Sequence, residues 1–130
     1  MRNRSLEMLN AIAQTIYDKK GFNILAIDVR GISSLTDYFL VAEGSVARHV
    51  QALSLVVQDK IEEMEYPIFH VDGGKAGDWV VVDCGDILVH LFSPELREKY
   101  ALEELWHEGT LVDLALKLEN LQGGERRSER

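Results

Sequence analysis

The chain has 130 residues, of which 46% are hydrophobic, a single cysteine and a formal net charge of −8. This length and apolar content suit one compact domain with a real core, and the lone Cys84 excludes an internal disulfide. An acidic chain without a basic stripe is a poor candidate for nucleic-acid binding, which depends on neutralising phosphates with Lys and Arg, and it suits a basic protein partner better.

The first third of the chain predicts a helix followed by two strands. Apolar residues recur every three or four positions from Leu6 to Ile16, the period of an amphipathic helix, and Lys19, Lys20 and Gly21 then supply cations at its C-terminus and a left-handed cap. Residues 24–29 and 38–43 are mostly apolar, so we expect two strands there, joined by the turn-rich loop RGISSLT.

The second predicted strand runs into Gly44-Ser45 and then into the most regular amphipathic pattern of the chain. Ser45 is the predicted N-cap of the next helix. The buried face of that helix consists of residues at helical spacing: Val46, Val50, Leu53, Val57, Ile61 and Met64. Pro67 stops the helix, and residues 68–71 make a short predicted strand.

Residues 79–84 and 87–92 flank Gly85-Asp86 and predict a hairpin with a two-residue turn that begins with glycine. Because side chains alternate along a strand, one face is wholly apolar and must be covered by helices: Val80, Val82, Cys84, Ile87, Val89 and Leu91. The other face is mixed: Trp79, Val81, Asp83, Leu88, His90 and Phe92. The mixed face is either a second core face with an internal Asp–His contact or a half-exposed platform where a partner docks.

Ser93-Pro94 predicts the start of a last long helix, which runs to about Trp106 and stops before Gly109. Tyr100 and Trp106 on this helix pose the same choice between core packing and partner contact. A tryptophan near the end of a helix can do both, because part of its ring is buried while the rest is available.

The end of the chain predicts a short amphipathic helix over residues 111–121 and a disordered tail. We therefore divide the chain into an α/β domain, residues 1–109, and an extension, residues 110–130. The predicted fold class is α/β: a single domain with a mixed sheet of about five strands and helices packed on it.

The strand–Gly44-Ser45–helix break is similar to the entry motif of nucleotidyltransferases, in which Gly-Ser opens a helix under a triphosphate. Those enzymes also need two carboxylates one residue apart on a neighbouring strand to hold magnesium. Here Arg30 stands where the second carboxylate would follow Asp28, and Asp83 and Asp86 are separated by the predicted turn. The paired catalytic carboxylates of those enzymes are therefore missing, a bare Gly-Ser before a helix is more often just a cap, and we predict no enzyme activity.

The remaining residues indicate neither a metal site nor a catalytic nucleophile. The four histidines, His49, His70, His90 and His107, show no metal-ligand spacing, and no second ligand lies near Cys84. The chain contains no G-x-S-x-G elbow, Walker lysine pattern or G-x-G-x-x-G. We predict no metal and no cofactor, and we expect Cys84 to be an inert packing residue.

Four stretches together resemble the ribosomal silencing factor family, also called Iojap-like proteins: IDVRGISSLTDYFLVAEG, the Arg-His of ARHV, DWVVVDCGDILVHLF and ELREKYALEELW. The last two are the most specific, because the tryptophans, acids, Gly-Asp and histidine keep their spacing over a long run. The resemblance implies a small cytoplasmic α/β protein, similar in fold to nucleotidyltransferases, that binds the large ribosomal subunit at its ribosomal protein number fourteen. Occupying that site would block joining of the small subunit and repress translation when nutrients are scarce.

For the docking surface we hypothesise the mixed hairpin face, with Trp79, Asp83, His90 and Phe92, together with Tyr100 and Trp106 beside it. The aromatic rings would supply buried area, and Asp83 a charge-assisted hydrogen bond to a basic partner. The acidic charge predicts little direct nucleic-acid binding. No segment approaches the roughly 20 apolar residues of a membrane helix, so we expect no membrane contact and a cytoplasmic location.

Two alternatives stay open at this point. One is a nucleotidyltransferase-like enzyme or nucleotide-binding protein that uses Ser45, Arg48 and either Asp28 or Asp83. The other is a homodimeric scaffold held together by the predicted helix over residues 111–121.

Overall fold

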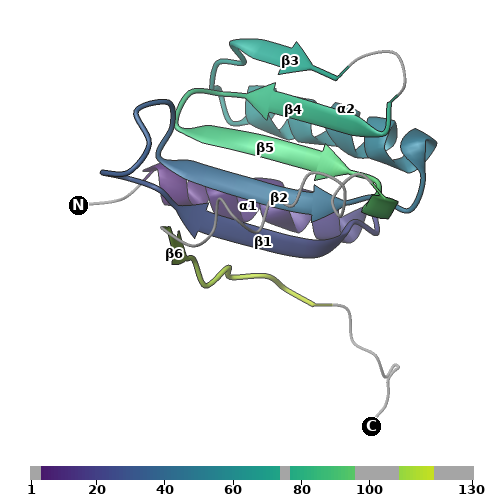
Figure 1. Cartoon of the computed structure of the whole chain (residues 1–130), viewed down its shortest axis with the longest axis horizontal. Helices are drawn as coiled ribbons and strands as arrows, with labels where there is room; N and C mark the ends of the chain where they lie inside the picture. The colour runs from purple at the N-terminus through teal and green to yellow at the C-terminus, as the bar shows by residue number, and fades with distance from the viewer. Residues whose placement is uncertain (1–3, 74–76, 96–108, 119–130) are drawn as a thin grey trace, which may run out of the picture.

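The computed structural model describes residues 4–73, 77–95 and 109–118. Their elements follow one another in the order α1 (Arg4–Asp18), β1 (Phe22–Asp28), β2 (Tyr38–Glu43), α2 (Ala47–Glu63), β3 (His70–Asp72), β4 (Trp79–Asp83), β5 (Ile87–Phe92) and β6 (Thr110–Leu111) (Figure 1). The strands form one six-stranded sheet in the order β3-β4-β5-β2-β1-β6. β2 and β5 are parallel, and the other neighbours are antiparallel. The predicted α/β fold with a mixed sheet is confirmed, with six strands where about five were expected.

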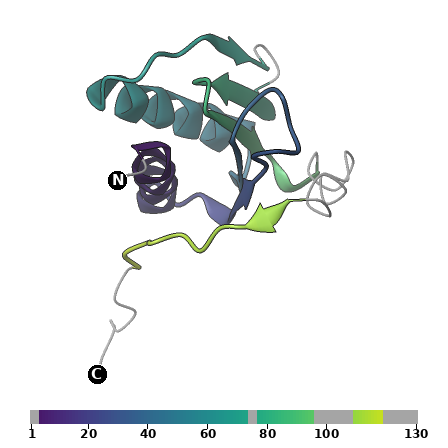
Figure 2. The same ribbon diagram turned by 90° about the vertical axis from the view of Figure 1, so that its left-hand side faces the viewer.

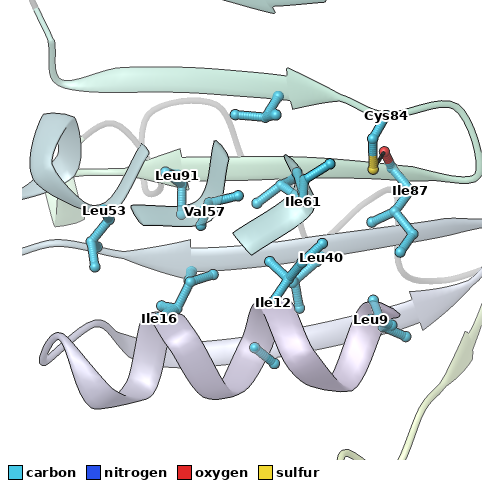
Figure 3. Close-up of a cluster of buried hydrophobic side chains, with 14 of the residues drawn as sticks. Leu9, Ile12, Ile16, Leu40, Leu53, Val57, Ile61, Cys84, Ile87 and Leu91 are labelled. Carbon is cyan, nitrogen blue, oxygen red and sulfur yellow. Dashed lines mark hydrogen bonds between the residues drawn. The ribbon is translucent and has the colours of Figure 1, made fainter. Parts of the chain in front are cut away.

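Both α1 and α2 pack on the same face of the sheet (Figure 2). The apolar hairpin face points toward them as predicted, and each of its six residues is at most 5% exposed. These side chains meet the buried faces of the helices in one core (Figure 3), to which the helices contribute Leu9, Ile12, Ile16, Leu53, Val57 and Ile61. Removing this apolar area from water is the main favourable contribution to folding. Neither described helix has the length and apolar character needed to cross a membrane.

α1 ends at Asp18 and the predicted left-handed cap follows it, but Lys20 rather than the glycine takes the left-handed conformation, with φ of 71°. The Gly21 N–H donates to the Ile16 carbonyl at 2.8 Å and closes the last turn. A Cβ on Gly21 would collide with the Ile16 side chain. Glycine is therefore required here for close packing and not for its freedom in φ.

The helix predicted over residues 111–121 is wrong for the part that the structure describes. Thr110–Leu111 forms the edge strand β6 on β1, and residues 112–118, which we call the strap, follow without helical structure. Exposure along the strap alternates, because Val112, Leu114 and Leu116 pack against the core while the residues between them are exposed. Residues 119–121 lie outside the described residues, and the division of the chain at residue 109 stays a prediction.

Hydrogen bonds from α1 hold the strap in place. The N–H groups of Ala115 and Lys117 donate to the side-chain oxygens of Asn10 and Gln14, each at 2.7 Å. The Gln14 amide also donates to the Lys117 carbonyl at 3.1 Å. Two helix side chains one turn apart thus satisfy the strap backbone in place of a neighbouring strand.

Candidate docking surface

The β4–β5 hairpin has the predicted register and turn. Trp79 pairs with Phe92, Val81 with His90 and Asp83 with Leu88, and the alternate residues of both strands lie in the core with the helices, so these six side chains share the face of the sheet turned away from α1 and α2. Gly85 begins the turn with φ of 92°, which only glycine adopts without strain. We call this side of β2, β4 and β5 the open face.

Parallel pairing of β2 with β5 adds to the open face two residues that the sequence prediction missed. Phe39 lies beside Leu88, and Val41 lies beside His90. The sequence pattern predicted β2 and β5 each as a strand, but nothing in the pattern indicated that these two strands would pair with each other. The pairing is a crossover through α2, β3 and β4, so it depends on how the helices cover the other side of the sheet.

Four rings form a continuous cluster on the open face. Trp79 and Phe92 stack with centroids 6.3 Å apart and planes 14° apart, and His90 and Phe92 stack at 6.0 Å and 7°. Phe39 meets the His90 ring edge-on at 5.6 Å. Phe92 is buried at the centre, while Trp79, His90 and Phe39 are partly exposed around it. The cluster is therefore preorganised and still presents ring surface at its margin.

His90 lies in this cluster between the rings of Phe39 and Phe92. Neither ring nitrogen has a hydrogen-bond partner in the described part of the chain, and both are removed from solvent. Burial lowers the pKa of His90 to about 4, so the imidazole is neutral at physiological pH. The internal Asp–His contact considered for this face is not formed, since neither His90 nitrogen bonds Asp83, and Asp83 Oδ1 accepts the Gly85 N–H at 2.9 Å.

Asp83 is partly exposed at the end of the hairpin. One carboxylate oxygen, Oδ1, accepts the turn hydrogen bond from Gly85. On the neighbouring strand β3, exposed His70 lies opposite Asp83 in the register. The position can therefore present negative charge at the edge of the aromatic cluster while the turn bond fixes the side chain.

The two remaining predicted docking residues, Tyr100 and Trp106, lie outside the described residues. The helix that carries them was predicted to start at Ser93-Pro94, and Pro94 and Glu95 are helical. The structure thus brings together Trp79, Asp83, His90 and Phe92 and leaves the other two as predictions.

The start of α2 differs from the prediction. Ser45 is not the N-cap; Val46 holds that position without a side-chain cap hydrogen bond. His49 reaches back instead, and its Nδ1 accepts the Ser45 N–H at 2.9 Å. Its Nε2, which must then carry the proton, faces the Lys19 carbonyl at 2.8 Å. The histidine thus joins the start of α2 to the end of α1.

Electrostatics at this helix start oppose a bound triphosphate. A cavity beside it is lined by Ser45, Val46, Ala47, Asp78, Ser93, Pro94 and Glu95, whose charged members are both acidic. Asp28 is not available for magnesium either, because Arg30 pairs with its carboxylate at 2.7 Å. This hydrogen-bonded guanidinium lowers the pKa of Asp28. The geometry therefore favours a structural role for the Gly44-Ser45 break.

Among the described residues, no three His, Cys, Asp or Glu side chains gather as metal ligands would. Cys84 is 2% exposed, as expected for a packing residue, and burial raises the pKa of its thiol to about 11. A thiol that stays protonated is a poor nucleophile, which agrees with the prediction that Cys84 is inert.

The described residues define a small α/β protein with α1 and α2 on one face of its sheet and an aromatic cluster on the other. A family model described as "Ribosomal silencing factor during starvation" matches residues 2–130, and the chain belongs to this ribosomal silencing factor family. The family resemblance seen in the sequence is thereby confirmed.

Relatives and solved structures agree with this assignment. The chain is 37% identical to ribosomal silencing factor RsfS of Bacillus subtilis over 82% of this chain and 91% of that protein. It is 30% identical to mouse "Mitochondrial assembly of ribosomal large subunit protein 1", over 75% of this chain and 44% of that protein. A crystal structure of a Chromobacterium violaceum protein matches with a TM-score of 0.75 and 32% identity, over 90% of this chain and 95% of that one.

Proposed function

We propose that this protein represses translation by binding the large ribosomal subunit through ribosomal protein number fourteen and sterically blocking the small subunit. The observation that carries the proposal is the preorganised aromatic cluster on the open face of a chain that belongs to the ribosomal silencing factor family. The name of the mouse relative, which refers to large-subunit assembly, supports the choice of subunit.

The open face has the make-up of a protein-binding hot spot. Hot spots are enriched in aromatic residues, and partly exposed Trp79, held by its stack on buried Phe92, supplies one on a rigid sheet. His90 costs stability in the free protein, because its desolvated nitrogens find no partner among the described residues. Such unsatisfied groups are exceptional in native proteins, and a role in function is one reason for their retention.

Charge supports a protein partner over RNA. The net charge of −8 disfavours contact with rRNA phosphates and favours a basic ribosomal protein. Asp83 would contribute a charge-assisted hydrogen bond to an Arg or Lys of that partner. Tyr100 and Trp106 would extend the same surface. We expect the protein to act in the cytoplasm, without a cofactor or metal.

The test is sedimentation of the purified protein with separated ribosomal subunits. The proposal predicts that the protein sediments with the large subunit and not with the small one. It also predicts that the complex formed with large subunits no longer yields joined ribosomes when small subunits are added. Sedimentation with neither subunit, or with the small subunit alone, would overturn it.

A further inference from the structure

The loop between β1 and β2 presents two large apolar side chains to solvent. Leu35 is 78% exposed, more than any other large hydrophobic side chain among the described residues, and Ile32 is 51% exposed. Single exposed hydrophobic residues are ordinary on protein surfaces. Two exposed hydrophobic residues on one short loop indicate a binding site only if the loop has a fixed shape and adjoins a functional surface.

Hydrogen bonds fix the shape of this loop. The N–H groups of Ile32 and Ser33 donate to the Val29 carbonyl at 3.0 and 2.9 Å. The Leu35 N–H donates to the Ser33 hydroxyl at 3.0 Å, so a side chain inside the loop holds the backbone of the exposed leucine. A partner that binds Leu35 would therefore pay little conformational entropy to order it.

The loop is also tied to the docking hairpin. The Thr36 hydroxyl donates to the Gly85 carbonyl at 3.0 Å, and the Asp37 N–H donates to the Asp86 carbonyl at 3.1 Å. These bonds place the loop at the end of the open face where Asp83, Leu88 and Phe39 lie side by side on β4, β5 and β2. The loop is thus continuous with the surface that carries the aromatic cluster.

We propose that Leu35 and Ile32 are a second anchor of the docking surface, which inserts into an apolar recess on the same basic ribosomal protein that covers the aromatic cluster. This inference rests on the proposed function and names residues of its interface. The charge around the loop fits the same partner, because Arg30 is neutralised by its pairing with Asp28 whereas Asp83 lies nearby on the hairpin. The loop would provide one contact at the Phe39 end of the aromatic cluster, and Trp79 another toward the other end of the same strands.

The experiment compares Leu35→Ser and the double variant Ile32→Ser/Leu35→Ser with Leu55→Ser. Leu55 is a matched control, because it is 63% exposed but lies on α2, on the far side of the sheet. All three changes are at exposed positions and should leave the thermal unfolding curve in place. Binding to isolated large subunits is measured by sedimentation over a range of protein concentrations.

We expect Leu35→Ser to weaken binding by roughly tenfold and the double variant by more, as removal of hot-spot side chains does. Leu35→Met should keep most of the affinity because it preserves apolar volume, and Leu55→Ser should bind as the unchanged protein does. Equal affinity of the double variant and the Leu55→Ser control would overturn the inference while leaving the proposed function intact. Failure of the unchanged protein to bind large subunits would overturn both.

Discussion

His90 stacks on Phe92 with the two ring planes 7° apart, and neither imidazole nitrogen has a hydrogen-bond partner among the described residues. The contact between the two rings is favourable, but it comes with an unfavourable desolvation of the imidazole nitrogens. The contact is of the kind that stabilises sheets by side-chain packing, whereas the desolvation destabilises the folded state and lowers the pKa of His90.

The first prediction concerns pH. The pKa of His90 is about 4 in the folded protein and near its ordinary value of 6.5 when the chain is unfolded. Between these values the unfolded chain binds a proton that the folded chain does not, so stability increases with pH through this window and is lost as the pH falls from 6.5 to 4. The gap corresponds to on the order of 3 kcal/mol. Urea unfolding at pH 7, 6, 5 and 4 measures it.

The control for that measurement is His90→Phe, which keeps a ring in the cluster and removes the titrating group. We expect this variant to be at least as stable as the unchanged protein at pH 7, because it removes two buried nitrogens that have no hydrogen-bond partner among the described residues. Its stability should also decline less between pH 6.5 and pH 4. Identical pH profiles for the two proteins would show that His90 titrates normally.

The second prediction concerns the start of α2. His49→Ala should lower the free energy of unfolding by about 1 kcal/mol, as loss of a helix cap does, because the Ser45 N–H and the Lys19 carbonyl both lose their partner. Ser45→Ala should change it by less than about 0.5 kcal/mol, since the Ser45 hydroxyl is not the cap. Chemical denaturation at pH 7 measures both. The reverse order would mean that the serine hydroxyl caps the helix after all.

The third prediction concerns the strap. Asn10→Ala/Gln14→Ala removes the side-chain oxygens that receive the Ala115 and Lys117 N–H groups. We expect hydrogen exchange at these two amides to speed by at least about tenfold and stability to fall by about 1–3 kcal/mol, roughly 1 kcal/mol per bond. Gln58→Ala is the control, because Gln58 bonds only Ser54 on α2 among the contacts described. Unchanged exchange at Ala115 and Lys117 would contradict the account.

The same variant tests the homodimer hypothesis for this part of the chain. A strap held within its own chain by α1 gives no reason for the molecular mass to change when the bonds are removed. Light scattering should therefore give the same mass for Asn10→Ala/Gln14→Ala and the unchanged protein. A shift to half the mass would place residues 110–118 in a dimer contact.

The fourth prediction concerns nucleotides. Calorimetric titration with a nucleoside triphosphate and magnesium should give no heat of binding at micromolar concentration. Arg30 pairs with the Asp28 carboxylate that would bind magnesium, and Asp78 and Glu95 in the cavity at the start of α2 would repel the triphosphate. Measurable binding that Asp28→Ala abolishes would revive the nucleotidyltransferase alternative.

The parts of the fold that were predicted correctly are those encoded by short-range periodicity. The hairpin shows this best, since Gly85-Asp86 specifies the turn and alternation then assigns Trp79, Asp83, His90 and Phe92 to one face. The pairing of β2 with β5 could not be predicted, because it is decided by long-range packing, and with it Phe39 was missed. The strap was misassigned because Leu111, Leu114 and Leu118 fit a helical spacing, whereas the free edge of β1 and the side chains of α1 stabilise an extended chain instead.

The most direct test of the central claim uses Asp83→Asn, with Asp59→Asn as the control. Asparagine can still accept the Gly85 N–H, so the hairpin turn is retained while the negative charge is removed. Asp59 is an exposed acid on α2, away from the open face. Large subunits are incubated with each protein, small subunits are added, and light scattering measures how many subunits join. The account predicts that the unchanged protein and Asp59→Asn block joining equally. Asp83→Asn should need about tenfold higher concentration for the same inhibition, because it loses one charge-assisted hydrogen bond to the partner. Equal inhibition by Asp83→Asn and Asp59→Asn would contradict docking through the open face.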